Sequence, residues 1–166
     1  NPSGNGAIYA GTTEGFWMSP DGGKTWSLTS QRELEVNSIA VHPDEPNKIY
    51  IATNNYGLMV STDGGKNFVA QNGNFTSRFM QDIIPDREIP NRFYATTNNT
   101  TTGGGFIFIS EDGGKSWTPA TKNLSVIRIK AFTLLQDKQT PDTIYIGTNL
   151  GVYRSLDRGK SWNPIP

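Results

Sequence analysis

The chain contains no cysteine, one histidine and only eight alanines among its 166 residues. The missing cysteine excludes a disulfide framework and thiolate metal sites, although it leaves the cellular compartment open. Scarce alanine, together with 18 glycines and 10 prolines, excludes a helical bundle. The 15 basic side chains are balanced by 15 acidic ones, which excludes a strongly basic nucleic-acid binder. No apolar run approaches the ~20 residues that cross a bilayer, so the sequence predicts no membrane-spanning helix.

What the sequence does contain is an eight-residue phrase with the pattern S-x-D-G/R-G-K-x-W/F, present four times. The four copies are Ser19–Trp26, Ser61–Phe68, Ser110–Trp117 and Ser155–Trp162. Successive copies are 42, 49 and 45 residues apart, a period that fits one four-stranded sheet with its connections. The sequence therefore predicts an all-β fold, a β-propeller built from four-stranded antiparallel blades, with about four blades present.

A second repeated pattern supports the first. A short apolar run precedes each phrase, with a tyrosine at its centre: Tyr9, Tyr50, Tyr94 and Tyr145. A further β-rich run follows each of them, and an upstream run (from Val36, Arg78 and Ile127) supplies an innermost strand. We expect one propeller segment over 1–166, with repeat units at about 1–30, 36–73, 78–124 and 127–166. Because the first unit lacks an innermost strand, we also expect an open edge, covered by further blades of a larger ring or by another chain.

The phrase itself has the chemistry of a tight turn. Aspartate accepts hydrogen bonds from backbone N–H groups a few residues ahead, and glycine supplies the positive φ that the connection needs. The aromatic residue then re-enters the sheet, where we expect it to be buried between blades, whereas the lysine stays in solvent. The residues given this structural role are Asp21, Gly23, Trp26, Asp63, Gly65, Phe68, Asp112, Gly114, Trp117, Asp157, Gly159 and Trp162.

Two other interpretations of the phrase fail. A phosphate-binding loop needs an earlier glycine, but Met18, Ile109 and Arg154 stand at that position. A calcium-binding EF-hand loop needs further ligands and a closing glutamate, which are absent. We therefore expect no metal and no cofactor.

The phrase resembles the Asp-box, also called the BNR repeat, and the resemblance covers the whole chain. That family includes sialidases, xyloglucan-cleaving glycoside hydrolases, the sortilin-type receptor ectodomain and a photosystem II assembly factor. The resemblance implies a propeller in which the box is a structural turn that lies away from the ligand face. It transfers the fold, whereas activity must be argued from a site.

Strand direction alternates through a blade, so the loops opposite the boxes share one face with the linkers between blades. The candidate ligand residues on that face are Glu14, Asn54, Asn55, Tyr56, Arg78, Asn99, Arg128 and Asn149. Arg78 and Arg128, expected at the starts of successive inner strands, could bind an anion or cap surface carbonyls. Tyr56 and Phe75 could stack on sugar rings or be buried at blade edges. The loop 98–105 is longer than its counterparts and is either functional or a flexible tip.

Catalytic groups are scarce on that face, and none is assigned. The arginine-containing sialidase signature is missing, and Glu14, with Glu33 and Glu35 in the next linker, does not make the carboxyl pair of a glycosidase. The single histidine, His42, is expected to be a solvated turn residue. We therefore predict a non-catalytic binding or scaffold module, secreted or periplasmic, that docks a protein or a glycan, as a subunit or assembly factor of a larger complex. The alternative is a fragment of a BNR-repeat glycoside hydrolase, sialidase-like or xyloglucanase-like.

Overall fold

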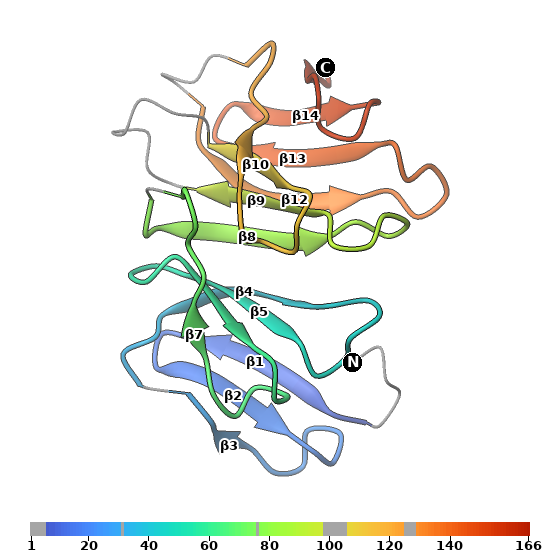
Figure 1. The fold of residues 1–166 in the computed structure, drawn as a ribbon. Coiled ribbons are helices and arrows are strands. Elements are labelled where there is room, and N and C mark those ends of the chain that lie inside the picture. Colours follow the sequence, from blue (N-terminus) through green and yellow to red (C-terminus); the bar gives the residue numbers. More distant parts are fainter. Residues whose placement is uncertain (1–5, 31, 76, 98–105, 125–128) are drawn as a thin grey trace.

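The computed structural model describes residues 6–30, 32–75, 77–97, 106–124 and 129–166, which form fifteen β-strands in four antiparallel sheets. We call the sheets blades 1 to 4 in chain order (Figure 1). Blade 1 contains β1 (Ile8–Thr12), β2 (Gly15–Ser19) and β3 (Ser27–Leu28), and blade 2 contains β4 (Val36–Val41), β5 (Ile49–Thr53), β6 (Leu58–Ser61) and β7 (Val69–Ala70). Blade 3 contains β8 (Met80–Pro85), β9 (Phe93–Thr97), β10 (Ile107–Ser110) and β11 (Thr118–Pro119). Blade 4 contains β12 (Ala131–Gln136), β13 (Ile144–Thr148), β14 (Gly151–Ser155) and β15 (Asn163–Pro164).

The innermost strands of successive blades are neighbours. β1 contacts β4, β4 contacts β8, and β8 contacts β12, so the four sheets lie side by side around one edge (Figure 1). The fold is therefore a β-propeller segment, as the repeat predicts, and none of its described residues forms a helix that could cross a membrane. Two inner strands were predicted to start too early: β8 begins at Met80 rather than Arg78, and β12 begins at Ala131 rather than Ile127.

The core consists of three apolar layers, one at each junction between blades. Strand alternation sends successive side chains to opposite faces, so each middle strand serves two layers. Phe16 and Ile51 lie between blades 1 and 2, and Tyr50 and Phe93 between blades 2 and 3. Ile107 and Trp162 lie between blades 3 and 4. At roughly 2 kcal/mol for each fully buried large side chain, the junctions are the main source of stability.

The innermost strands of blades 2, 3 and 4 each carry a β-bulge near their start. The register shifts between Val36 and Ser38 in β4, between Met80 and Asp82 in β8, and between Ala131 and Thr133 in β12. The extra residue bends the strand and re-aims the side chains that follow it. The repetition places Ser38, Asp82 and Thr133 at equivalent positions of three neighbouring blades.

The four boxes form the same turn. In the first box, Asp21 Oδ1 accepts from the N–H groups of Lys24 and Thr25, at 3.0 and 2.9 Å, and from the Ser19 hydroxyl. The Ser19 hydroxyl oxygen in turn accepts from the N–H of Gly23. These bonds lower the pKa of Asp21 to about 2, chiefly through the backbone N–H and the hydroxyl of Thr25.

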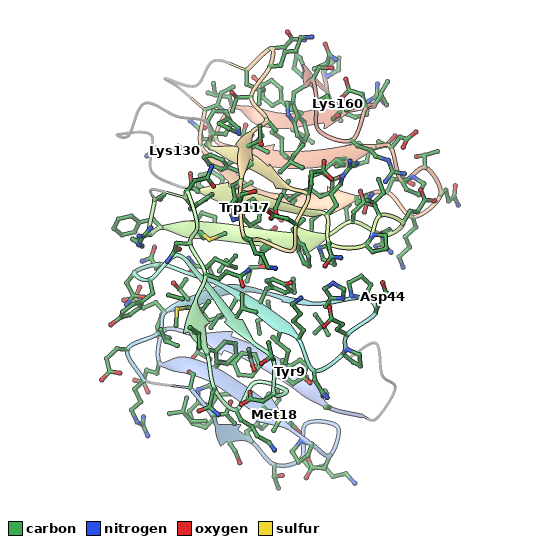
Figure 2. All side chains as sticks on the ribbon, in the orientation of Figure 1. Tyr9, Met18, Asp44, Trp117, Lys130 and Lys160 are labelled. Carbon is green, nitrogen blue, oxygen red and sulfur yellow. The ribbon has the colours of Figure 1, made fainter. Side chains whose placement is uncertain are left out.

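The box aromatics are not all buried, contrary to the sequence expectation. Trp117, between blades 2 and 3 (Figure 2), and Trp162, between blades 3 and 4, are 4% and 1% exposed. Phe68 is half-buried, and Trp26 is 41% exposed. The reason is positional: each box aromatic packs against the preceding blade, and no described blade precedes Trp26.

His42 is also different from the expectation of a solvated residue, because it is only 2% exposed. Its Nδ1 accepts from the N–H groups of Asp44 and Glu45, both at 3.2 Å. Its Nε2 lies 3.2 Å from Oδ1 of Asn91 in blade 3. The ring is thus a buried turn acceptor at the junction of blades 2 and 3.

Candidate functional site

The face opposite the boxes, called the box-free face below, is shaped by a repeated threonine. The hydroxyls of Thr12, Thr53 and Thr148 donate to carbonyls across the loop, at Gly15, Gly57 and Gly151. The same oxygens accept from the N–H groups of Glu14, Tyr56 and Leu150. This arrangement holds those three side chains at the loop tips. The signal was present in the sequence, since a threonine ends every tyrosine strand, and sequence reasoning missed it.

Two acids on the box-free face, Glu14 and Glu35, have side-chain partners. Glu14 forms an ion pair with Arg32, 3.5 Å apart, in which both side chains are about 70% exposed. Such a surface pair contributes little to stability. Glu35 Oε2 accepts from Nδ2 of Asn54 at 2.8 Å, and Nδ2 of Asn55 donates to the Glu33 carbonyl. The Nδ2 groups of Asn54 and Asn55 therefore bind the preceding linker and are not available to a ligand.

Arg78 and Asn149 also make local contacts. Nη1 of Arg78 donates to the carbonyls of Phe75 and Ser77, at 2.8 and 3.3 Å, which favours the carbonyl-capping alternative. Asn149 Oδ1 accepts from the Lys130 N–H at 2.6 Å. The candidates Asn99 and Arg128, and the long loop 98–105, lie outside the described residues.

Exposed apolar side chains remain for contact with a ligand on this face. Tyr56, Phe79 and Phe132 are each more than 40% exposed, whereas Phe75 is buried. The N–H of Gly57 donates to the Arg78 carbonyl, which places the Tyr56 loop of blade 2 beside the start of β8 and therefore beside Phe79. Phe132 is the bulge residue of β12 in the next blade. The three rings lie at the box-free ends of their blades, in the β5–β6 loop and at the starts of β8 and β12, and we call them the aromatic row. Leu150, in the β13–β14 loop, adds an exposed aliphatic side chain.

Asp82 is a residue that sequence reasoning missed. Its Oδ1 accepts from the Ser38 hydroxyl of β4 at 2.6 Å and from the Ile83 N–H. Its Oδ2 accepts from the Leu134 N–H of β12 at 2.7 Å and from the Thr133 hydroxyl. One carboxylate thus joins the inner strands of three blades, and its acceptor sites are occupied. Among the described residues, no cluster of three or more acidic, histidine or cysteine side chains could hold a metal ion.

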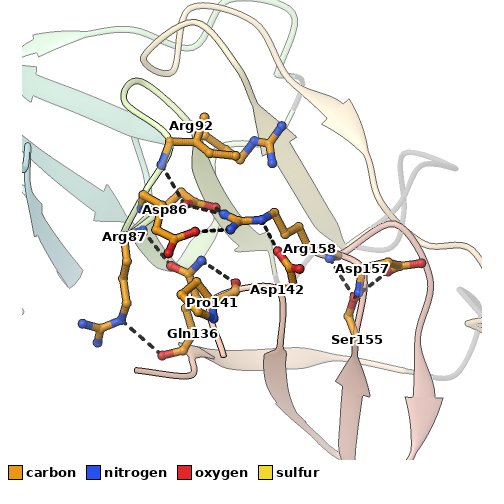
Figure 3. A network of polar contacts seen from close by, with 12 residues as sticks. Asp86, Arg87, Arg92, Gln136, Pro141, Asp142, Ser155, Asp157 and Arg158 are labelled. Carbon is orange, nitrogen blue, oxygen red and sulfur yellow. Dashed lines mark hydrogen bonds and ion pairs between the residues drawn. The ribbon is translucent and has the colours of Figure 1, made fainter. Parts of the chain in front are cut away.

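On the opposite, box-bearing side, Arg158 forms the centre of a polar network between blades 3 and 4 (Figure 3). It replaces the first glycine of the other boxes and keeps a positive φ of 56°. The guanidinium contacts Asp86, Glu88 and Asp142 at 2.8, 2.5 and 2.5 Å. Burial alone would raise the pKa of Asp86, but hydrogen bonds from Tyr94, two backbone N–H groups and Arg158 outweigh it and lower that pKa.

Two hollows adjoin this network. One, of about 320 Å³, lies beside the outer strands of blade 3 and is lined by Arg92, Glu111, Pro119, Arg158 and Lys160. The other, of about 400 Å³, follows the inner strands and is lined largely by Val41, Ile84, Pro85, Leu134 and Leu135. The arginines at both hollows are engaged with carboxylates or carbonyls, as Arg92 is with Glu111 and Arg87 with Gln136.

Comparison with known proteins agrees with this geometry. The family model described as "BNR/Asp-box repeat" matches residues 108–119, which contain the third box. The chain is 28% identical over 145 residues to a probable oligoxyloglucan-reducing end-specific xyloglucanase of Neosartorya fischeri, covering 80% of this chain and 18% of the relative. It is 26% identical over 157 residues to a xyloglucanase of Hypocrea jecorina, covering 92% of this chain and 17% of the relative. The chain thus spans less than a fifth of the length of these relatives.

Solved structures give the same picture. A crystal structure of an ancestral GH74 enzyme matches with a TM-score of 0.82 and 26% identity, over 99% of this chain and 23% of that one. A structure of YCF48 bound to a D1 peptide matches with a TM-score of 0.64 and 19% identity, over 96% of this chain and 49% of that one. The second similarity is one of fold alone.

Proposed function

Since the chain belongs to the Asp-box, or BNR-repeat, β-propeller family, we propose that it is a glycan-binding propeller segment whose box-free face holds a β-glucan of the xyloglucan type. The observation that carries the proposal is the aromatic row of Tyr56, Phe79 and Phe132, which is exposed on that face. Aromatic rings offer flat apolar surfaces on which sugar rings stack. The xyloglucanase relatives support this class of ligand.

Binding, rather than bond cleavage, is what the described residues of this face support. A glycosidase needs one carboxyl group to protonate the leaving oxygen and a second one opposite it. Glu14, Glu35 and Asp82 are each held by a partner on the protein, and Asp82 has its acceptor sites filled by four donors. A polymer of this kind does not cross membranes, so the proposal places the chain outside the cytoplasm.

The xyloglucanase relatives favour a second candidate function. In this alternative, the chain contributes its four blades to a larger xyloglucan hydrolase, and the acids of the reaction come from elsewhere in that protein. The small share of the relatives that the chain spans, 18% of the Neosartorya protein, is compatible with this alternative. The two candidates share the binding face and differ in whether turnover occurs.

The experiment is a calorimetric titration of the purified chain with xyloglucan oligosaccharides, repeated with Tyr56→Ala, Phe79→Ala and Phe132→Ala. Loss of one stacking ring should weaken binding by about 2-fold to 12-fold, corresponding to 0.5–1.5 kcal/mol. Leu156→Ala is the matched control, because Leu156 is 61% exposed but lies in the fourth box turn. Equal affinities for all four variants would contradict the proposed face, and release of new reducing ends by the chain alone would contradict a binding-only role.

A further inference from the structure

The innermost strands β4, β8 and β12 lie side by side but belong to three different sheets. Within a sheet, a ladder of backbone hydrogen bonds fixes how each strand is placed along its neighbour. Between sheets, that placement depends on side chains. At the box-free end it depends on Asp82, whose Oδ1 accepts from the Ser38 hydroxyl of β4 at 2.6 Å and whose Oδ2 accepts from the Leu134 N–H of β12 at 2.7 Å.

Asp82 also lies close along the chain to one ring of the aromatic row and contacts the neighbour of another. It is the third residue after Phe79 and follows the bulge of β8. Thr133, whose hydroxyl donates to Oδ2 of Asp82 at 3.2 Å, directly follows Phe132. The carboxylate therefore links the backbone segment that carries one ring to the segment that carries the other.

The residues that precede and follow Phe79 are held by blade 2. The carbonyl of Arg78 accepts from the Gly57 N–H at 3.1 Å, and the carbonyl of Met80 accepts from Nδ2 of Asn37 at 2.7 Å. The position of this ring relative to blade 2 is thus held by two bonds in which the carboxylate takes no part. Its position relative to the ring of blade 4 depends on the carboxylate.

A carboxylate at this position can make a link that a hydroxyl cannot. Ser38, Asp82 and Thr133 hold equivalent positions of three neighbouring blades. A hydroxyl donates one hydrogen bond, so Ser38 and Thr133 each serve one neighbour, whereas the two carboxylate oxygens serve both. Hydrogen bonds to an ionised carboxylate are also shorter and stronger than neutral ones, which suits them to hold two strands in one arrangement.

We propose that Asp82 is a positioning residue of the box-free face, which holds Phe79 and Phe132 at a fixed separation at which both rings stack on one glycan chain. This inference rests on the proposed function of that face. Two linked contacts increase the affinity for a ligand only when their separation matches the ligand, and a separation fixed before binding avoids an entropic cost. Asp82 acts through the two rings and does not itself touch the glycan.

Two variants remove the link in different ways. Asp82→Asn keeps the size of the side chain but replaces one acceptor oxygen with an NH2 donor, so the N–H of Ile83 or of Leu134 loses its acceptor. Thr133→Val removes one hydroxyl contact and keeps a β-branched side chain, so it carries the test if Asp82→Asn does not fold. Asp137→Asn is the matched control, because that carboxylate accepts from N–H groups of its own turn at the box-bearing end of blade 4.

The first measurement is the affinity of the purified chain for glucose and for a long xyloglucan oligosaccharide, by NMR titration. Glucose has one sugar ring and stacks on one aromatic ring at a time, whereas the oligosaccharide reaches both. Asp82→Asn and Thr133→Val should each weaken binding of the oligosaccharide by about 2-fold to 12-fold, the share that one stacking ring contributes. The affinity for glucose should stay unchanged, because each ring is still present. A general loss of folded structure would weaken both.

The second measurement is the separation of the two ring positions without any ligand. Because the chain contains no cysteine, Phe79→Cys and Phe132→Cys together provide two unique sites for spin labels. Pulsed electron paramagnetic resonance should give a narrow distance distribution in the otherwise unchanged chain and in the Asp137→Asn control. The distribution should become broader or shift in Asp82→Asn and in Thr133→Val.

The two measurements separate this inference from the proposed function. An unchanged distance distribution in both variants, or equal weakening of glucose and oligosaccharide binding, would overturn the role of Asp82. A wild-type chain that binds neither sugar would overturn the proposed function, and the distance distribution would then still decide whether Asp82 sets the separation of the rings.

Discussion

The guanidinium of Arg158, in the fourth box, binds the buried carboxylate of Asp86, in the preceding blade, with Nη1 at 2.8 and 2.9 Å from its two oxygens. Asp86 is fully buried, and its charge is stabilised by this contact, by the Tyr94 hydroxyl at 2.6 Å and by the backbone N–H groups of Glu88 and Ile89. Arg158 stands where three boxes have glycine and keeps a positive φ, which is unfavourable for a side chain with a Cβ. The ion pairs between blades offset that conformational cost.

Replacing Arg158 with glycine restores the common box sequence but leaves Asp86 without its cation. We expect the free energy of unfolding to fall by about 3 kcal/mol, because breaking a buried pair strands the remaining charge. Urea denaturation at neutral pH measures the change, with Lys160→Ala, two residues further along the same box, as the control. The double variant with Asp86→Asn should recover part of the loss, and an unchanged single variant would contradict the role of the network.

Stability should fall in acid because several carboxyl groups have lowered pKa values in the folded chain. The backbone N–H and hydroxyl of Thr25 lower the pKa of Asp21 to about 2, from an unfolded value near 3.9. A lowered folded-state pKa contributes stability that is complete above the unfolded value and disappears as the pH falls through the folded one. The urea midpoint should therefore decrease from pH 5 toward pH 2, and Asp21→Asn should flatten this dependence. Equal midpoints at both ends would exclude the mechanism.

His42 should be replaceable by a residue that accepts hydrogen bonds and by no apolar residue. Asp86 and Asp137 accept the same pair of N–H groups in the equivalent turns of blades 3 and 4. His42→Asn should therefore change the free energy of unfolding little, whereas His42→Leu should cost about 1–3 kcal/mol because two N–H groups lose their acceptor. Thermal and urea unfolding measure both, with the exposed Asp44→Ala as control. A stable leucine variant would show that the ring serves only to fill space.

The two tryptophans Trp26 and Trp162 should differ although they occupy the same box position. Trp162→Ala removes a buried indole that donates to the Ala120 carbonyl at 2.8 Å, and should cost about 3–5 kcal/mol. Trp26→Ala should cost less than half as much in dilute solution, because its ring is 41% exposed. Denaturation at low protein concentration compares them. Equal losses would mean that Trp26 packs as fully as its counterpart.

The fold could be predicted from the sequence because the residues of each repeat unit determine its own turn and its own alternating strands. The four sheets, their strand order and the three-stranded first blade are confirmed. The exposure of Trp26 was not predictable from the box, since the motif fixes a position within a blade and not whether another blade lies against it. The buried state of His42 has the same origin, because its cover comes from blade 3.

The candidate site was harder to predict for a related reason. Sequence reasoning identified polar residues on the box-free face, but it could not tell which of their donors were already engaged by neighbouring segments. Asn54 bonds Glu35, 19 residues away, and Asp82 bonds residues 44 and 52 positions away. Such pairs depend on how one blade is set against the next, which no local pattern records.

The contact between Asn74 and Trp117 affects how the chain unfolds. Its side-chain amide donates to the Trp117 carbonyl and accepts from the Trp117 N–H, as a neighbouring strand would. These two bonds, and those of Asp82, exist only while adjacent blades are both intact, so losing one blade removes partners from the next. Nearest-neighbour coupling of this kind makes a repeat array cooperative. The described blades should therefore melt in a single transition rather than one after another.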